Sequence, residues 1–350
     1  MGSVDHTVWQ QDDVDPAGVE QAMRALERER FLRREQALPA RALNLVTVVE
    51  AAYAGEIARR LEATGGNAPS RSILLRVEPG RTRLAARVTL DGDGTSAMHE
   101  LVTFDIGRRH LARLESIVDP VVMTDVPTLL WSPHQIPGAL DALLPLAQTV
   151  MLDSSDAGDP AEGFDEALAL QERHDVSIVD LSWLRTQPWR QRLASAFAEP
   201  HRRGRLDDVR EVEVRHQRGS AAAAWLLLGW LADRLGWRPD PAEPGVAIDP
   251  RGGRVALRPV EADAGVTGLA GATVRGADGS SFALDRNPGG LRGRDRPAPG
   301  DPKDERSWTI MGASRGEAGV LSAALRRTLV PDDGYRAALS GARRLLADRA

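Results

Sequence analysis

Short apolar segments of strand type, separated by helical segments and turns, dominate residues 40–155 and constrain the fold most. The run ALNLVTVVEAA is rich in β-branched residues and has almost no polar positions. SILLRVE, RLAARVTL and MHELVTFDI follow, separated by the turns EPGR and DGDG, and PTLLW comes later. Strands mixed with intervening helices predict an α/β layer architecture for this part of the chain.

The second half of the chain has the same mixed character without a convincing internal repeat. It opens with DVSIVDLSWLRTQPWRQRLASAF, in which Asp180 is a good helix N-cap and Pro188 is expected to kink or split the helix. VREVEVRHQ alternates as a strand does, and SAAAAWLLLGWLADRLGW is typical of a buried helix. We therefore expect two α/β domains, with mixed sheets flanked by helices.

Changes in composition suggest where these domains begin and end. Residues 1–39 are expected to form an N-terminal helical segment, and residues 40–155 the N-terminal α/β domain. A linker and bridging helix are expected over 156–174, and the C-terminal α/β domain over 175–350. Within that domain, the glycine- and proline-rich stretch 287–305 predicts a flexible loop.

Composition excludes several classes of protein. The 350-residue chain has a net charge of −5, which gives no sequence-wide basic footprint for nucleic acid. It has no cysteine, so disulfides, thiolate metal sites and cysteine nucleophiles are excluded. The acidic amino terminus does not resemble a signal peptide, and the longest apolar stretch, Ala221–Ala232, is too short to cross a bilayer. We expect a cytoplasmic protein that binds neither nucleic acid nor membrane.

The motifs that usually mark catalysis are incomplete in this sequence. GASRG at 312–316 fits a nucleophile elbow, but every histidine precedes Ser314, whereas an α/β-hydrolase needs its histidine after the serine. The only lysine, Lys303, has no phosphate-loop context, and no G-x-G-x-x-G follows the first apolar strand. The histidines are scattered without metal-ligand spacing. We therefore predict no catalytic residues, no cofactor and no metal.

Tryptophan and arginine are concentrated in one tract, where Trp183 and Trp189 lie close to Arg185 and Arg190. These two residue types are the ones most enriched in interface hot spots. The same pattern fits tryptophans that fill a core while arginines cover its rim, and the sequence does not decide between the two. Arg71, before a strand, is suited to binding a phosphate or to making a salt bridge, and the salt bridge is the favoured reading.

Three segments resemble the OpcA family of glucose-6-phosphate dehydrogenase assembly proteins: NAPSRSILLRV (67–77), ESIVDPVVMTDVPTLLWSPH (115–134) and DVSIVDLSWLRTQPWRQRLASAF (175–197). The ending LSAALRRTLVPDDGYRAAL is similar to that family's carboxy-terminal pattern. The residues that carry the resemblance, and that are candidates for partner binding or structure, are Ser70, Arg71, Trp131, Asp180, Trp183, Arg185, Pro188, Trp189 and Arg190.

The resemblance implies a function that the residues alone do not. It implies a non-enzymatic bacterial protein that assembles or allosterically activates glucose-6-phosphate dehydrogenase in the oxidative pentose phosphate pathway. On this reading, the surface around Trp183, Arg185, Trp189 and Arg190 contributes to docking or supports the docking face. Replacing both arginines with alanine is then expected to weaken binding and to leave the fold intact. Two alternatives remain, a metabolite-sensing module and an enzyme, each binding a sugar phosphate through arginines.

Overall fold

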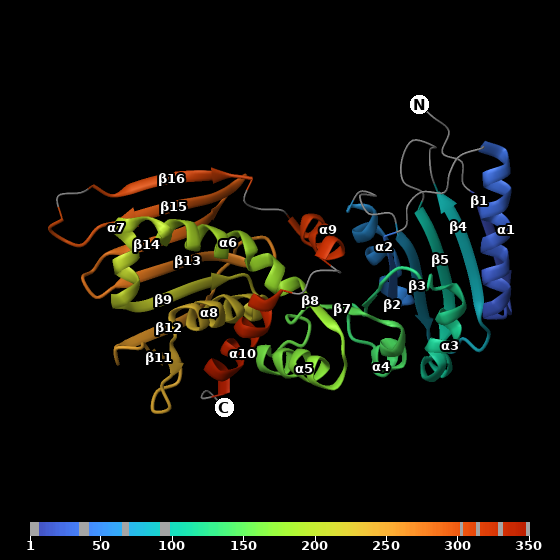
Figure 1. The fold of residues 1–350 in the computed structure, drawn as a ribbon, viewed down its shortest axis with the longest axis horizontal. Helices are drawn as coiled ribbons and strands as arrows, with labels where there is room; N and C mark the ends of the chain where they lie inside the picture. Colours follow the sequence, from blue (N-terminus) through green and yellow to red (C-terminus); the bar gives the residue numbers. More distant parts are fainter. Residues whose placement is uncertain are drawn as a thin grey trace. The chain divides into compact units, whose positions relative to one another are not determined.

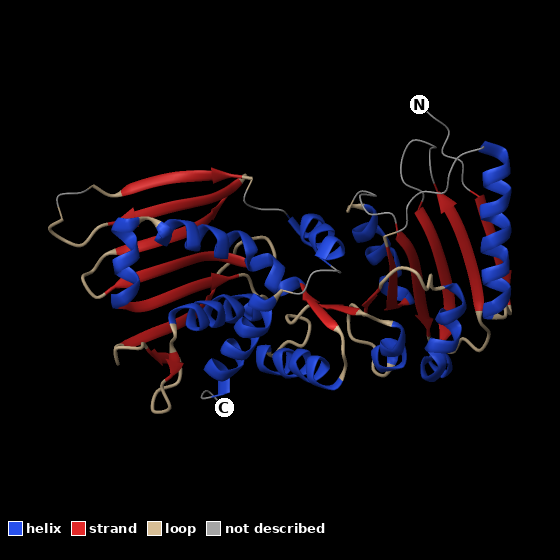
Figure 2. Ribbon diagram, viewed as in Figure 1, coloured by secondary structure: helices blue, strands red, loops and turns tan. Residues whose placement is uncertain are grey.

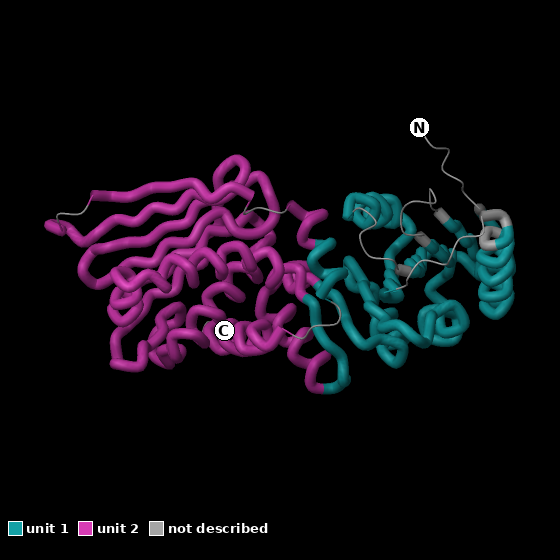
Figure 3. The backbone as a smooth tube through the Cα atoms, turned by 45° about the horizontal axis from the view of Figure 1, so that its top comes forward, with its two compact units in different colours: residues 1–152, 173–179, 321–331 teal, residues 153–172, 180–320, 332–350 magenta. Residues whose placement is uncertain are grey.

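The computed structural model describes residues 7–34, 42–64, 70–91, 99–301, 304–312, 316–327 and 332–347. These residues form two compact units that interleave along the chain (Figure 3). One unit comprises residues 1–152, 173–179 and 321–331, and the other comprises residues 153–172, 180–320 and 332–350. Each unit contains strands and helices (Figures 1 and 2), so the predicted α/β class is confirmed for both halves.

The first sheet has eight strands in the order β1-β4-β5-β3-β2-β6-β7-β8. Its strands are β1 (Thr7–Asp12), β2 (Leu43–Glu50), β3 (Ser70–Glu78), β4 (Ala85–Asp91), β5 (His99–Gly107), β6 (Thr128–Trp131), β7 (Thr149–Leu152) and β8 (Ser177–Asp180). β2 is buried along almost its whole length, as expected for a parallel strand with both faces covered. The chain runs from β2 outwards through β3 and β5, then returns to β6 on the other side of β2, which makes β2/β6 a topological switch point.

Helices and short turns connect these strands and bury their apolar sides against the sheet. They are α1 (Pro16–Arg34), η1 (Ala51–Tyr53), α2 (Ala54–Glu62), η2 (Arg108–Arg113), α3 (Leu114–Val118), η3 (Asp119–Val121), α4 (Ala139–Leu143) and η4 (Leu144–Leu146). Val19 and Met23 bring α1 into one hydrophobic core with Ile73, Leu75 and other residues of the sheet. The helical segment predicted for residues 1–39 therefore also contains a strand, β1, which pairs antiparallel with β4.

The second sheet also has eight strands, in the order β10-β11-β12-β9-β13-β14-β15-β16. They are β9 (Val209–His216), β10 (Arg238–Pro239), β11 (Val246–Ile248), β12 (Arg254–Glu261), β13 (Leu269–Gly276), β14 (Ser281–Asn287), β15 (Gly290–Arg296) and β16 (Arg306–Met311). β9 alternates between buried valines and more exposed charged residues, so one face of the sheet is packed and the other is not.

The remaining helices are α5 (Pro160–Arg173), α6 (Leu181–Ala198), α7 (Pro200–Arg203), η5 (Gly204–Asp208), α8 (Ala221–Leu235), α9 (Gly316–Arg327) and α10 (Asp333–Ala347). They belong to the second unit, except that α9 passes into the first unit at Leu321. In Figure 1, α6, α8 and α10 lie along one side of the second sheet, and they contact β13, β9 and β10, respectively. None of the described helices combines the length and apolar character that crossing a bilayer requires.

Two local expectations are corrected by this fold. Residues 290–296, predicted as part of a flexible loop, form β15 between β14 and β16, because glycines there allow close approach: a Cβ on Gly290 would lie 2.0 Å from the carbonyl oxygen of Ile310. Pro188 does not split α6, which runs as one helix from Leu181 to Ala198. The burial of Trp183, Trp189 and other residues of this helix outweighs the backbone hydrogen bond that proline removes.

The contact between α8 and α10 depends on glycine. A Cβ at Gly229 would lie 2.3 Å from the carbonyl oxygen of Ala338 and 2.5 Å from the backbone nitrogen of Ala342, and Gly341 faces Gly229 from α10. Backbone atoms cannot move aside as a flexible side chain can, so this helix pair tolerates no side chain at the crossing.

We predict that Gly229→Ala lowers the free energy of unfolding by about 2 kcal/mol or more, because α8 and α10 must separate to admit the methyl group. Gly55→Ala is the matched control, since Gly55 lies on exposed α2, where the nearest atom to a new Cβ is an arginine side-chain nitrogen 3.7 Å away. That control should be neutral or stabilising by up to about 1 kcal/mol. Urea denaturation of both variants measures the difference, and equal stabilities would contradict the assigned packing.

Candidate functional site

Asp180 ends β8 and caps the amino terminus of α6, and its carboxylate is the centre of a buried network in the second unit. Oδ1 accepts hydrogen bonds from the backbone nitrogens of Ser182 at 2.8 Å and Ser154 at 3.2 Å. Oδ2 accepts from the hydroxyls of Ser154 at 2.5 Å and Tyr335 at 3.0 Å. Asp180 therefore connects α6 with the turn after β7 and with α10.

A second carboxylate, Asp153, connects the same turn to the next residues of α6. Its Oδ1 accepts from the hydroxyl of Ser182 at 2.5 Å, and its Oδ2 accepts from Nη1 of Arg185 at 2.6 Å. The other side of the Arg185 guanidinium binds Glu317 at the start of α9 in a bidentate pair, with distances of 2.9 and 2.7 Å. Arg185 is only 8% exposed, so its charge is neutralised inside the unit.

Trp183 is held on both its edge and its face. Its indole nitrogen donates to Oδ2 of Asp332 at 2.8 Å, and its ring lies 5.9 Å from that of Tyr335. The guanidinium carbon of Arg190 lies 3.2 Å from the centroid of the Trp183 ring, while Arg190 Nε donates to the hydroxyl of Thr186. Trp183 is 2% exposed, so it belongs to the core.

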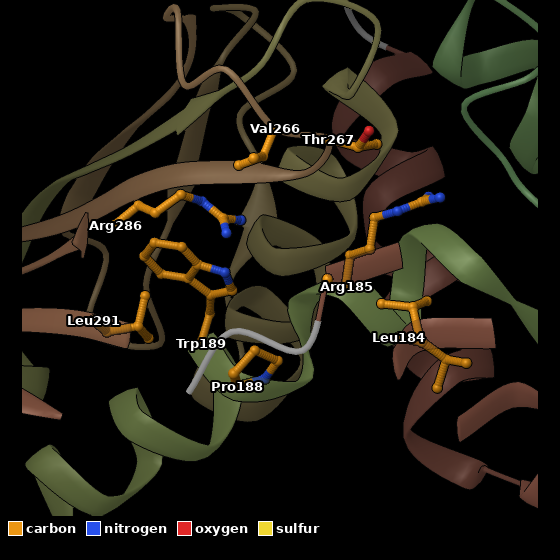
Figure 4. A pocket seen from close by; sticks show the side chains of 10 residues that line it. Leu184, Arg185, Pro188, Trp189, Val266, Thr267, Arg286 and Leu291 are labelled. Atoms are coloured by element: carbon orange, nitrogen blue, oxygen red, sulfur yellow. The ribbon is translucent and has the colours of Figure 1, made fainter. Parts of the chain in front are cut away.

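A small cavity of about 80 Å³ lies beside the middle of α6. Pro188 and Trp189 contribute its apolar side, Val266 its rim, and Arg286 of β14 a guanidinium (Figure 4). Trp189 is itself only 1% exposed, whereas Val266 is 46% exposed. The tract thus presents no tryptophan on the surface of the unit, and the question that the sequence left open is decided in favour of the core.

The electrostatics of the network follow from its burial. Burial, with a smaller contribution from the charge of Asp153, raises the pKa of Asp180 to about 6, although hydrogen bonds from Ser154 and Tyr335 act in the opposite direction. Burial and the neighbouring Asp180 raise the pKa of the Tyr335 hydroxyl well above its usual range. Burial disfavours the charge on Arg185, but Glu317 and Asp153 outweigh it and raise the pKa of Arg185.

The remaining predicted residues belong to the first unit. Arg71 of β3 is 8% exposed and donates to Glu100 at 2.7 Å, to Glu27 at 3.1 Å and to the carbonyl oxygen of Val121 at 2.8 Å, which is the salt-bridge alternative. Trp131 ends β6, is 1% exposed, and has Arg60 above its ring at 5.4 Å. Ser70 begins β3. Arg71 and Trp131 thus make their contacts within the first unit and are not part of the α6 network.

The loop after β2 is where a fold of this topology receives the pyrophosphate of a dinucleotide. In a G-x-G-x-x-G that starts at the end of the strand, the three glycine positions are taken by Glu50, Ala52 and Gly55. Glu50 brings a carboxylate, held 3.1 Å from Arg108, to the place of the pyrophosphate, and Ala52 adds a Cβ where the backbone must approach it. These residues do not fit a dinucleotide.

An aromatic pair lies at the switch point itself. Tyr53 follows β2 and His134 follows β6, and their ring centroids are 4.6 Å apart. No group of three or more histidine or carboxylate side chains that could hold a metal occurs among the described residues. Ser314 of the GASRG motif lies outside the described residues, so the structure adds nothing on that motif.

Comparison with known proteins identifies the family. Residues 62–169 match the N-terminal domain described for the glucose-6-phosphate dehydrogenase subunit, and residues 176–339 match its C-terminal domain. The chain belongs to the OpcA family. Helix α6 with Glu317, Asp332 and Tyr335 therefore lies in the match to the C-terminal domain, whereas Asp153, Ser154 and Arg71 lie in the match to the N-terminal domain.

Curated relatives agree with this family. An OxPP cycle protein OpcA of Synechocystis sp. is 30% identical over 132 residues, which are 37% of this chain and 28% of the relative. That of Synechococcus elongatus is 29% identical over 169 residues, 46% of this chain and 36% of the relative. The matches thus span about a third of the relatives' length.

A solved structure shows the same fold with little sequence identity. KijD10, a 3-ketoreductase from Actinomadura kijaniata in complex with NADP and TDP-benzene, has a TM-score of 0.50 and 11% identity, covering 88% of this chain and 97% of its own. At this identity, the likeness concerns the fold alone.

Sequence analysis missed the partners of the α6 tract. Asp153 and Ser154 lie directly after β7, at the end of the predicted N-terminal domain and outside the C-terminal one. The carboxyl ends of the neighbouring strands β7 and β8 lie at the same end of the sheet, which is a signal that could have paired these residues with Asp180. Glu317, Asp332 and Tyr335 lie more than 130 residues along the chain from their partners. No local pattern indicates these contacts.

We predict that Arg185→Ala lowers the free energy of unfolding by about 3 kcal/mol, because it leaves the carboxylates of Asp153 and Glu317 without their counter-ion. Because Arg185 is buried, this predicted loss of stability replaces the expectation from sequence that the fold stays intact without its side chain. Arg192→Ala on the same helix, half-buried and with no ion pair shown among the described residues, should cost less than about 0.5 kcal/mol. Chemical denaturation of both variants is the test, and equal losses would contradict the assignment.

We predict a pH dependence that belongs to Asp180. The folded chain holds the Asp180 proton up to about pH 6, whereas an unfolded aspartate releases it near pH 4, so this residue stabilises the fold fully below pH 4 and loses that contribution as the pH rises through 6. The stability of the wild type minus that of Asp180→Asn should fall by roughly 2 kcal/mol between pH 4 and pH 7. Urea denaturation across this range measures the difference, and a difference that rises with pH would refute the assignment.

Proposed function

We propose that this chain is a non-enzymatic partner of glucose-6-phosphate dehydrogenase that favours the assembled, active form of the enzyme in the cytoplasm, within the oxidative pentose phosphate pathway. One observation carries this proposal beyond the family match: the fold is that of a ketoreductase, but the loop after β2 has Glu50 and Ala52 where a dinucleotide needs glycine. A chain that keeps this fold without its nucleotide loop is better suited to binding a protein than to transferring hydride.

The binding free energy that activation requires can be estimated from the shift in the enzyme's equilibrium. A partner protein can shift an enzyme towards its active form only by binding that form more tightly than the alternative. A shift from 1:9 to 9:1 needs a difference in binding free energy of about 2.6 kcal/mol. Loss of one hot-spot side chain in an interface changes the binding free energy by a similar amount. A modest surface therefore suffices, and no catalytic group is needed.

On this proposal, the tryptophans and arginines of α6 support docking indirectly, without touching the partner. Trp183, Arg185 and Trp189 are buried, so they act by holding the surfaces around them in place. The bidentate pair between Arg185 and Glu317 fixes the start of α9 beside the cavity at Pro188 and Val266. Disturbing the tract would then weaken binding and folding together, which distinguishes support from direct contact.

The test is a titration of the purified chain into the cognate glucose-6-phosphate dehydrogenase, with NADPH production and sedimentation velocity followed on the same mixtures. We expect a saturable rise in rate together with co-sedimentation, because preferential binding to the active form must appear in both measurements. The chain alone, given glucose 6-phosphate and NADP⁺, is the control and should show no turnover.

Two outcomes would overturn the proposal. Absence of co-sedimentation and of any rate change, with both proteins folded, would remove the partner. Turnover by the chain alone would remove the non-enzymatic role.

A further inference from the structure

The second sheet has one face that helices cover and one that they do not. α6, α8 and α10 lie along the same side (Figures 1 and 2), and α7 joins them through the 2.7 Å ion pair between Arg202 and Asp295 of β15. Buried side chains such as Val212, Val214 and Leu291 point to this side. The alternate residues of the same strands point to the opposite side, which we name the open face.

Arginines are the most numerous side chains on the open face. Among those that project from β9, β12, β13 and β15 are Arg215, Arg258, Arg275, Arg292, Arg294 and Arg296. The carboxylates that accompany them are Glu211, Glu213, Asp285 and Glu305. The part of this face that these ten residues form has a net charge of +2, whereas the whole chain has −5. Its charge is opposite in sign to that of the molecule that carries it.

The ion pairs on the open face hold the arginines in place without neutralising them. Asp285 binds Arg215 and Arg294, each at 2.7 Å, so one carboxylate serves two guanidiniums. Arg292 makes a single long hydrogen bond, 3.4 Å, to the hydroxyl of Ser307 and has no carboxylate partner among the described residues. Each guanidinium has five donors, so most donors on β15 remain available to a ligand.

A depression of about 310 Å³ lies in the middle of the open face. Its floor is made of small residues, Thr273, Ser281 and Ala283. Four arginines of β9, β13 and β15 stand around it, together with the carboxylates of Asp285 and Glu305. The four guanidiniums outnumber the two carboxylates of this recess, so a ligand carboxylate that enters it can reach several donors at once.

We propose that the open face binds an acidic surface of a partner protein, with a carboxylate side chain seated in the depression. This rests on the proposed function where the partner is glucose-6-phosphate dehydrogenase. The face extends over several strands and is mostly polar around the depression, which suits a salt-dependent, reversible protein contact. A second copy of the chain would present the same basic face, so the charges disfavour self-association through it.

The test compares two double charge reversals that alter net charge equally. Arg292→Glu with Arg296→Glu changes the open face at two exposed positions. Arg203→Glu with Arg306→Glu is the matched control, because Arg306 is exposed on β16 opposite Asp295, on the covered side, and Arg203 is exposed on α7. The dissociation constant for glucose-6-phosphate dehydrogenase is measured for each at several salt concentrations, and binding of a poly-glutamate peptide is measured in parallel.

We expect the open-face variant to bind the enzyme about tenfold or more weakly, with a shallower salt dependence, and the control to stay within about twofold of the wild type. We expect the affinity for poly-glutamate to fall in the open-face variant and to change little in the control as well. Unchanged affinity and salt dependence of the open-face variant, for both ligands, would overturn the proposal. The wild type could also bind poly-glutamate through this face and fail to bind the enzyme. That result would overturn the proposed function and would support the open face as a surface for acidic ligands.

Discussion

The hydrogen bonds that converge on Asp180 determine how the second unit is assembled. One carboxylate accepts from Ser154, Ser182 and Tyr335, which come from the turn after β7, the start of α6 and the start of α10. These donors fix where α6 begins and how it is rotated. That rotation brings Trp183 to Asp332, and Arg185 to Asp153 and Glu317. The network is buried and costly to leave incomplete, so it specifies one arrangement of these segments.

The sequence predicts the class of the fold well and its pairing poorly. The apolar strands of residues 40–155 and the alternation of β9 indicate two α/β domains, because periodicity records which faces are buried. The addition of β1 to the edge of the first sheet and the interleaving of the two units depend on contacts between distant segments. β15 shows the limit of composition: glycine indicates a loop, but Gly293 is required where its strand packs under the Trp308 ring.

The sequence predicted the central residues of the candidate site but not the residues that contact them. Asp180 as an N-cap and the tryptophan–arginine tract could be identified from local sequence, since capping and composition are local properties. Whether the tryptophans face a partner or the core could not, because that depends on Asp332 and Tyr335, about 150 residues away. Trp183 is buried with its indole nitrogen paired to Asp332, which is what a core tryptophan requires.

Arginine has two separate uses in this chain. Arg71, Arg185 and Arg202 are buried against carboxylates, so their charge is neutralised within the fold. Arg292 and Arg296 stand on the open face of a sheet, in a stretch for which the sequence predicted only a flexible, glycine-rich loop. Most of the residues that carry the family resemblance, such as Trp131, Asp180 and Trp183, are buried in the same way. Resemblance to a family can therefore rest on the residues that build the scaffold, while recognition of a partner depends on a surface with weaker sequence signals, and the two must be sought by different arguments.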